Sequence, residues 1–429
     1  MAESAELSQD DNAGAAGALD HATGALIAAQ RAKVVAALAR HFRDVDMAEE
    51  AFQDAALRAV KNWPQQGNPR DPAAWLIMVG RNAIIDRLRK QKRFADYARD
   101  NPAEENAGDQ ETLLAEEIDL SGLRDDVLRL MFMCCHEELA VTDQLALALK
   151  VIVGFPVDKI ARALMIKPKA MEQRITRAKK KAAAVATRLD TPMLQERAHR
   201  LEAVSTMVYL LFNEGYSAGG GDLHIRTELC EEAIRLGRLL LEMFPAQPEV
   251  MGLLALCLLQ HSRWRARMDE DGGLIPLADQ DRSKWDGEAI TEGKVLLEKA
   301  LMRGRPGIYQ IQAAIAATHC SATDDTSTDW SEIANLYSAL YALQPTPIVA
   351  LNRAVAIAKT EGEKSALDII EPLAGQLDNY LYFHSTRASM LAAVGRTGEA
   401  RAAYDRALEL EPTTAERDHI EGKIARLEN

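Results

Sequence analysis

The sequence is poor in several residue types, and each shortage excludes a class of protein. Its 429 residues include only five cysteines, an odd and sparse set that does not suit a disulfide framework. Aromatic residues make up only 5% of the chain, and alanine, leucine, arginine and glutamate are abundant, as in helical proteins. We therefore expect an all-α protein of a reducing compartment, with few strands.

The chain also lacks long apolar runs and a cationic start. The first 20 residues carry five acids and no lysine or arginine, the reverse of an export signal. The densest apolar stretch, "MGLLALCLLQ" from Met251, is much shorter than the roughly 20 residues that span a bilayer. We expect a cytoplasmic protein that is neither exported nor inserted in a membrane.

Charge changes sign along the chain, whose formal net charge is −13, and these changes indicate its divisions. Residues 100–119 hold eight acids and no lysine or arginine, which is typical of a tether. "TPM" at Thr191 indicates a helix stop and restart. The predicted segments are a disordered acidic tail (1–20), a first helical block (21–97), an acidic linker (98–119), a second block (120–190) and a long helical region (191–429).

One short segment concentrates the cations. Residues 165–183 contain seven lysines or arginines and a single acid, Glu172. On a helical wheel, one side is a stripe expected to be buried, made of Met171, Ile175, Ala178 and Ala182. The opposite side carries Lys169, Gln173, Thr176, Arg177, Lys180 and Lys181, with Arg174 at its edge. The pattern predicts an amphipathic helix with a basic face.

A second short helix is predicted just upstream, in "FPVDKIARALMI". Its apolar positions, Val157, Ile160, Ala161 and Leu164, could pack against the stripe, and the connection ends at Pro168. Two short helices joined in this way form a helix-turn-helix, whose second helix can enter the major groove. Lys169, Gln173 and Arg174 could then reach base edges, while Arg177, Lys180 and Lys181 meet phosphates. A solvated basic face or a partner-binding helix is the alternative.

The first helical block contains two further helices of interest. "AEEAFQDAALRAVKNW" has a polar side made of Glu49, Glu50, Gln53 and Asp54, which suits a basic protein partner or is plain surface. "AAWLIMVGRNAIIDRLRKQKRF" begins apolar and ends basic. One stripe of it holds Trp75, Val79, Asn82, Asp86, Arg89 and Arg93. An aromatic with cations along one helix suits single-stranded DNA, although Trp75 could equally be a core residue.

These three motifs, in this order, resemble regions two and four of bacterial RNA polymerase sigma factors of the extracytoplasmic-function group. The resemblance covers residues 22–189 and implies a subunit without catalysis of its own, whose partners are core RNA polymerase and promoter DNA. It departs from the family pattern at Met165, where glycine is frequent, and at Ala170, where threonine or serine is frequent. Met165 raises the cost of a left-handed turn, and Ala170 makes the promoter sequence harder to infer.

The resemblance also implies roles for individual residues. Glu49, Glu50, Gln53 and Asp54 would grip the clamp helices of the polymerase's largest subunit. Minus-ten DNA would be melted and read by the loop Pro64 to Asp71 and by Trp75, Arg81, Asn82, Asp86, Arg87 and Arg89. Duplex minus-thirty-five DNA would be read by Lys169, Gln173, Arg174, Arg177, Lys180 and Lys181. The acidic linker would follow the RNA exit path, its charge mimicking RNA.

The last region has the pattern of a helical-repeat array. "HSTRASMLAAVGRTGEARAAYDRALELEP" places Ala388, Gly395, Ala400, Tyr404, Ala407 and Pro412 on the small, turn and large positions of a tetratricopeptide repeat. A looser copy precedes it, and earlier helix pairs lack the signature. Through "FNEGYSAGGG", "DEDGGLIPLADQDRSKWD", "LCEEAIRLGRLL" and "ALNRAVAIA", the region resembles the C-terminal extension of a sigma-factor subgroup with a tetratricopeptide-like domain, which would regulate the sigma modules. The short connection at residues 190–193 predicts direct contact with them.

The repeat pattern is absent from two stretches of this region, "FNEGYSAGGG" and "DEDGGLIPLADQDRSKWD". We interpret their polar residues as a regulatory cluster: Asn213, Glu214, Tyr216, Asp279, Asp281, Arg282 and Asp286. A buried hydrogen-bonded network, a binding site for a ligand or for the sigma modules, and a catalytic site all remain open. We expect no cofactor and no metal, because the acid spacing does not suit calcium and adjacent residues of "MCCHEE" on a helix cannot share a zinc ion.

Three functions follow from these features. The favoured one is a promoter-specificity subunit, in which the cations lie where duplex DNA is met and the acidic segments suppress stray binding. The second is a tetratricopeptide-like scaffold or ligand sensor anchored to DNA. The third is an enzyme built on the regulatory cluster.

Overall fold

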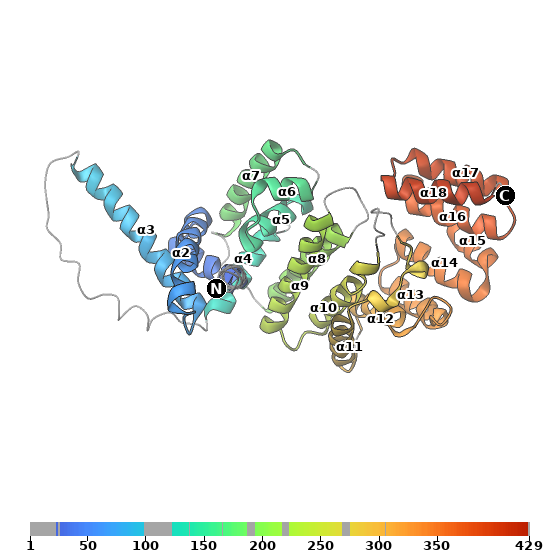
Figure 1. Ribbon diagram of the computed structural model, residues 1–429, viewed down its shortest axis with the longest axis horizontal. Coiled ribbons are helices and arrows are strands. Elements are labelled where there is room, and N and C mark those ends of the chain that lie inside the picture. Colours follow the sequence, from blue (N-terminus) through green and yellow to red (C-terminus); the bar gives the residue numbers. More distant parts are fainter. Residues whose placement is uncertain are drawn as a thin grey trace, which may run out of the picture. The chain divides into compact units, whose positions relative to one another are not determined.

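The computed structural model consists of helices and turns. It describes residues 23–97, 122–186, 194–216, 223–267 and 275–427, apart from positions 25, 137, 165 and 305. Among the described residues there is no strand, which confirms the all-α prediction (Figure 1). The predicted acidic tail, the acidic linker, the turn at Met165 and the connection at 190–193 lie outside these residues. The chain forms two compact units, Met1–Met207 and Val208–Asn429.

The first unit contains two groups of helices. Residues 26–42 form a helix that precedes α2. The following elements are α2 (Val45–Gln66), α3 (Pro72–Tyr97), α4 (Gly122–Cys134), α5 (Val141–Ala148), a π-helical turn (Leu149–Val153), α6 (Val157–Ala163) and α7 (Pro168–Ala186). Helix α2 packs against α3, and α7 packs against α4, α5 and α6.

Side-chain caps fix the ends of α2 and α3. The Asp44 carboxylate accepts a hydrogen bond from the backbone N–H of Met47 at 3.0 Å, which satisfies a free donor at the start of α2. Asp71 does the same for Ala74 at the start of α3. Helix α2 does not end at Pro64, as the sequence suggested, but continues to Gln66. It stops at Gly67, whose φ of 84° is readily adopted only by glycine.

Helix α7 has the predicted amphipathic pattern. All four residues of the predicted stripe, Met171, Ile175, Ala178 and Ala182, are at most 4% exposed. Ile160 and Ala161 of α6 are buried as well, while Val157 and Leu164 are partly exposed. The two helices therefore pack through apolar residues, as a helix-turn-helix requires, and the basic face of α7 points outward.

The second unit is a succession of helices. After α8 (Leu194–Tyr216), within which the two units divide, the α-helices are α9 (Leu223–Met243), α10 (Pro248–His261), α11 (Gly287–Leu301), α12 (Ile308–Ser321), α13 (Trp330–Leu343), α14 (Pro347–Glu361), α15 (Glu363–Ile370), α16 (Leu381–Ala393), α17 (Thr397–Glu409) and α18 (Thr414–Leu427). From α9 to α18 each helix packs against the next in sequence. Short 3-10 turns, Trp264–Ala266, Leu277–Asp279 and Arg282–Lys284, lie between α10 and α11.

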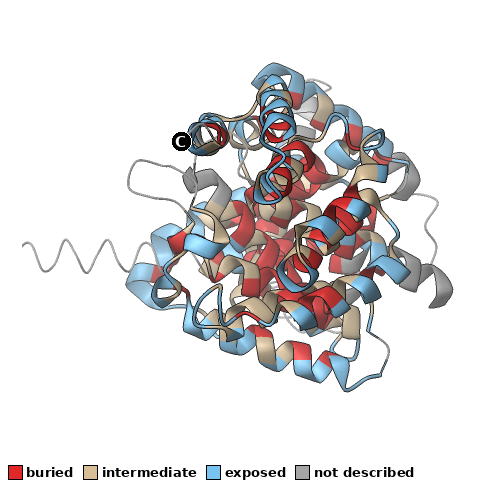
Figure 2. Ribbon diagram, turned by 90° about the vertical axis from the view of Figure 1, so that its right-hand side faces the viewer, coloured by how far each residue is buried: buried red, intermediate tan, exposed pale blue. Residues whose placement is uncertain are grey.

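The last helices of this unit bury the positions singled out in the sequence. Ala388, Ala400, Tyr404 and Ala407 lie in one apolar cluster shared by α14 to α18. Gly395, with a φ of 80°, makes the turn between α16 and α17. Buried residues follow the sides of these helices that face their neighbours, and exposed residues follow the outer sides (Figure 2). No described helix is long and apolar enough to cross a membrane.

One glycine sets the distance between α2 and α3. A Cβ atom on Gly80 would lie 2.6 Å from the backbone oxygen of Ala51. We expect Gly80→Ala to destabilise the first unit by about 1 to 3 kcal/mol, because backbone atoms must move and the gain in helix propensity is smaller. Gly422→Ala in α18, where a Cβ has no neighbour within 4 Å, is the control and should be neutral or stabilising. Urea unfolding measures both.

Candidate polymerase and promoter interface

The four polar residues predicted on α2 differ in their exposure. Gln53 and Glu50 are exposed and Asp54 is partly exposed, whereas Glu49 is buried, with 6% of its surface accessible. Two cations hold its carboxylate. Arg31 donates a hydrogen bond to Oε1 at 2.9 Å, and Lys179 of α7 donates one to Oε2 at 2.6 Å. Three segments that are far apart in sequence therefore meet at one carboxylate.

Lys179 joins α7 to α2 through a second acid. Its Nζ atom is also 2.5 Å from the carboxylate of Asp46, in the first turn of α2. Burial opposes the charged form of this lysine, but the hydrogen bonds to Asp46 and Glu49 outweigh that effect and raise the pKa of Lys179. The lysine therefore remains a cation in a half-buried position.

Arg31 is held in place from several sides. It is 7% exposed, its guanidinium lies 4.9 Å from the ring centre of Phe52, and it donates a hydrogen bond to the backbone oxygen of Lys150 at 3.3 Å. Gly154 follows the π-helical turn with a φ of 91°, and a Cβ there would lie 2.3 Å from Arg31 Nε. Glycine at this position thus leaves room for the arginine as well as permitting the backbone conformation.

Helix α3 carries the side chains predicted to meet melted DNA. Trp75 is partly buried and packs edge-on against Trp63 of α2, with ring centres 5.3 Å apart. Farther along, Arg81, Asn82 and Arg87 are partly exposed, while Asp86 and Arg89 are exposed. Arg87 pairs with Glu50 of α2. The side chain of Arg93 lies outside the described residues.

The basic face of α7 is present as predicted. Lys169, Gln173, Thr176, Arg177, Lys180 and Lys181 are exposed. Arg174 is partly buried, with its Nε atom 3.6 Å from the carboxylate of Asp143, and Lys181 donates a hydrogen bond to the backbone oxygen of Glu138. Arg177 and Lys180 have no ion pair among the described residues. The face therefore offers cations to a polyanion without first breaking strong pairs.

Among the described residues, the members of the predicted regulatory cluster bond to other neighbours and not to one another. Arg282 donates hydrogen bonds to the backbone oxygens of His319 and Ala322, at 2.7 and 2.9 Å, and so fixes the end of α12. The Asp281 carboxylate accepts a hydrogen bond from the backbone N–H of Ser283, and the Asp286 carboxylate caps the start of α11. Both aspartates are exposed, and so is Asp279. The buried-network interpretation is thus wrong for the three aspartates, because turns and helix starts in this segment need acceptors at the surface.

The structure adds two arginines that the sequence analysis missed. Arg263 and Arg267 hold Tyr216. Arg263 donates to its hydroxyl, and Arg267 donates to its backbone oxygen at 2.8 Å while its guanidinium lies 3.8 Å from the ring centre. Asn213 and Glu214 are partly exposed on α8, and burial raises the pKa of Glu214. The spacing of the basic residues in "HSRWRAR" was the available signal.

The cysteines of "MCCHEE" belong to the core. Cys134 and Cys135 are buried, and burial raises the pKa of Cys135 to about 12. Among the residues that the structure describes, no group of three His, Cys, Asp or Glu side chains is placed to hold a metal ion.

Comparison with known proteins bears directly on the two helical groups of the first unit. A model of sigma-70 region 2 matches residues 26–94, and a model of sigma-70 region 4 matches residues 129–181. The chain belongs to the sigma-70 family. In this sigma factor, α2 and α3 form region two and the helix-turn-helix of α6 and α7 lies in region four. These regions imply binding to core RNA polymerase and promoter DNA in transcription initiation.

Two further matches carry no stated function. A model of a family of unknown function, DUF6596, matches residues 200–301. The sigma factor is also 51% identical over 406 residues to "Uncharacterized protein R00370" of Rhizobium meliloti (strain 1021). That match covers 94% of this chain and 95% of the relative, so the similarity extends through both units.

Removal of the Glu49 carboxylate should strongly destabilise the first unit. Glu49→Gln takes away the anion that Arg31 and Lys179 share and leaves Lys179 with Asp46, and we expect the free energy of opening of α2 to fall by about 3 to 5 kcal/mol. Glu50→Gln, which removes an exposed carboxylate, should cost about 1 kcal/mol or less. Hydrogen exchange of peptides from α2 measures both. Equal effects in the two variants would contradict the assignment.

His319 should make stability depend on pH. Burial, reinforced by the cations Arg263 and Arg282 and only partly offset by Asp325, lowers the pKa of His319 to about 4. The unfolded chain, with a pKa near 6.5, therefore takes up the proton first. The contribution of neutral His319 to the free energy of unfolding is fully present above about pH 6.5 and is lost as the pH falls towards 4. The loss is at most about 3 kcal/mol. Urea unfolding at several pH values should give a flatter profile for His319→Gln, and parallel profiles would refute the prediction.

Proposed function

We propose that this sigma factor belongs to the extracytoplasmic-function group and acts in the cytoplasm as a promoter-specificity subunit, with no catalysis of its own. The observation that carries the proposal is α7. An outward basic face lies over a fully buried stripe, on the second helix of a helix-turn-helix. Its exposed cations suit duplex minus-thirty-five DNA, with Lys169, Gln173 and Arg174 facing bases and Arg177, Lys180 and Lys181 facing phosphates.

Region two supplies the other two contacts of the proposal. The basic end of α3 would bind the melted minus-ten element, with Arg81, Asn82, Asp86, Arg87 and Arg89 as the contacting residues and Trp75 as a candidate for base stacking. The polar side of α2 would contact core polymerase. Glu50 and Gln53 are exposed for that contact. Glu49 is covered by Lys179, so its contact with polymerase requires that lysine to leave.

The second unit is proposed to be a tetratricopeptide-like regulatory domain. Ala388, Ala400, Tyr404 and Ala407 are buried where such a repeat packs its paired helices, and Gly395 makes the turn between them. We propose that this domain regulates the sigma modules by direct contact. Run-off transcription by the full chain, compared with that by a chain ending at Asp190, shows whether the domain inhibits or assists initiation. Equal transcription by the two chains would contradict it.

Substituting the α7 cations tests the promoter assignment. In run-off transcription with core polymerase, we expect Arg174→Ala with Arg177→Ala to reduce transcript by about 100-fold or more, since each removed contact is worth about 1 to 3 kcal/mol. The slope of the logarithm of promoter affinity against the logarithm of salt concentration should fall by about one, because Arg177 is the phosphate contact of the pair, and binding to core polymerase should be unchanged.

Two exposed cations of the second unit provide the control. Lys364→Ala with Arg417→Ala removes the same charge at positions that are exposed and lie on α15 and α18. This variant should transcribe like the unmodified chain. Full activity of the α7 variant, with core binding intact, would exclude α7 as the promoter-reading helix.

A further inference from the structure

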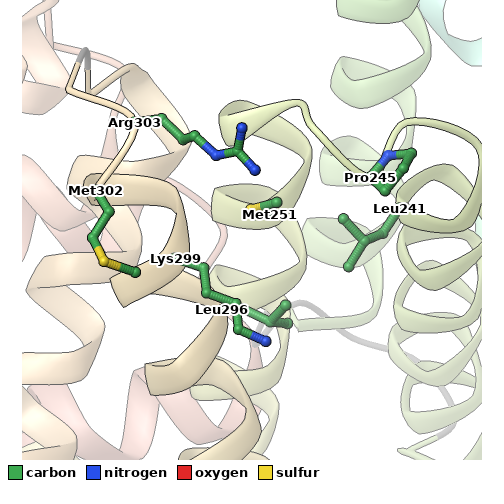
Figure 3. Close-up of a pocket in the computed structure, with 7 residues that line it drawn as sticks. All are labelled: Leu241, Pro245, Met251, Leu296, Lys299, Met302 and Arg303. Carbon is green, nitrogen blue, oxygen red and sulfur yellow. The ribbon is translucent and has the colours of Figure 1, made fainter.

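A cavity of about 440 Å³ lies in the second unit where α9 and α11 end beside the start of α10. Figure 3 shows its lining side chains. They are Leu241, Pro245, Met251, Leu296, Lys299, Met302 and Arg303. The volume falls within the roughly 300 to 1,000 Å³ of sites that bind small molecules.

The side chains that line this cavity are either apolar or positively charged. Five of the seven side chains are apolar, the other two are cations, and none is an acid. In Figure 3 the Arg303 side chain extends towards Met251, and Lys299 lies beside Leu296. Within the described part of the chain, neither cation has a salt bridge. Small-molecule sites characteristically combine an apolar wall with a few placed polar groups, and here those groups are both positive.

The position of the cations at the end of a helix has an ordinary explanation. Lys299 lies in the last turn of α11 and Arg303 follows it, where positive charge interacts favourably with the helix dipole. That effect does not require an apolar cavity beneath them. The apolar surface continues beyond the cavity, since the lining residue Met302 is 73% exposed and Leu301 next to it in sequence is 41% exposed. Exposed apolar side chains beside cations that pair with no described acid favour an occupant that is both apolar and anionic.

We propose that this cavity binds a small amphipathic anion, with an apolar body against Leu241, Met251 and Leu296 and a carboxylate held by Lys299 and Arg303. Arginine can hold a carboxylate through two parallel hydrogen bonds, and lysine adds a point charge. Methionine side chains adapt their shape, so Met251 and Met302 can close around the apolar part. The site concerns the second unit alone and does not depend on the proposed role of α7.

Fluorescence of 8-anilinonaphthalene-1-sulfonate with the full chain tests the proposal, because this probe has an aromatic body and one anionic group. We expect saturable binding that decanoate displaces and decanol displaces much less. In the variant Lys299→Gln with Arg303→Gln, the dissociation constant for decanoate should rise about tenfold. Both substituted residues are exposed, so the fold should be retained, and the thermal midpoint checks this.

Lys364→Gln with Arg417→Gln is the matched control, since it removes two exposed cations elsewhere in the same unit. It should bind decanoate like the unmodified chain. The proposal is overturned by equal displacement with decanol and decanoate, by unchanged decanoate affinity in the cavity variant, or by the absence of saturable binding. None of these results bears on transcription, so failure here is distinct from failure of the sigma assignment.

Discussion

The burial of the Glu49 carboxylate is the constraint on which the packing of the first unit depends. Removing a carboxylate from water costs several kcal/mol unless cations and hydrogen bonds replace the lost hydration. Here the replacement comes from Arg31, 18 residues away, and from Lys179, 130 residues away. Region two and region four are thus joined by ion pairs. Gly154 adds to this arrangement because the absence of a side chain leaves space for Arg31.

Features with a local period could be predicted from the sequence. The stripe and the basic face of α7 follow from 100° per residue, and the structure confirms both sets of residues. The helices of the second unit were expected from the repeat pattern of the last region, and its described residues are helical from α9 to α18 apart from turns and loops. The order of the three motifs was sufficient to indicate sigma regions two and four, which match the chain at residues 26–94 and 129–181.

Features that depend on distant residues could not be predicted. On α2 alone, Glu49 looked like its exposed neighbours Glu50 and Gln53, because nothing nearby in sequence shows that a lysine of α7 covers it. Lys179 itself lies next to the buried stripe, four residues after Ile175, and that position was the one available signal. The aspartates of the predicted cluster were grouped by proximity in sequence, yet Asp281 and Asp286 each cap a local turn or helix.

Lys179 links the helix proposed to read promoter DNA to the helix proposed to contact polymerase. It lies on the helix whose outer face carries the exposed cations, and it pairs with acids on the helix whose polar side was assigned to polymerase. A cation from a partner that pairs with Glu49 competes with this lysine, and a polyanion that attracts the lysine uncovers Glu49. By thermodynamic linkage, each event then favours the other by the same factor. With the contacts proposed above, one ammonium group would link polymerase binding to DNA binding.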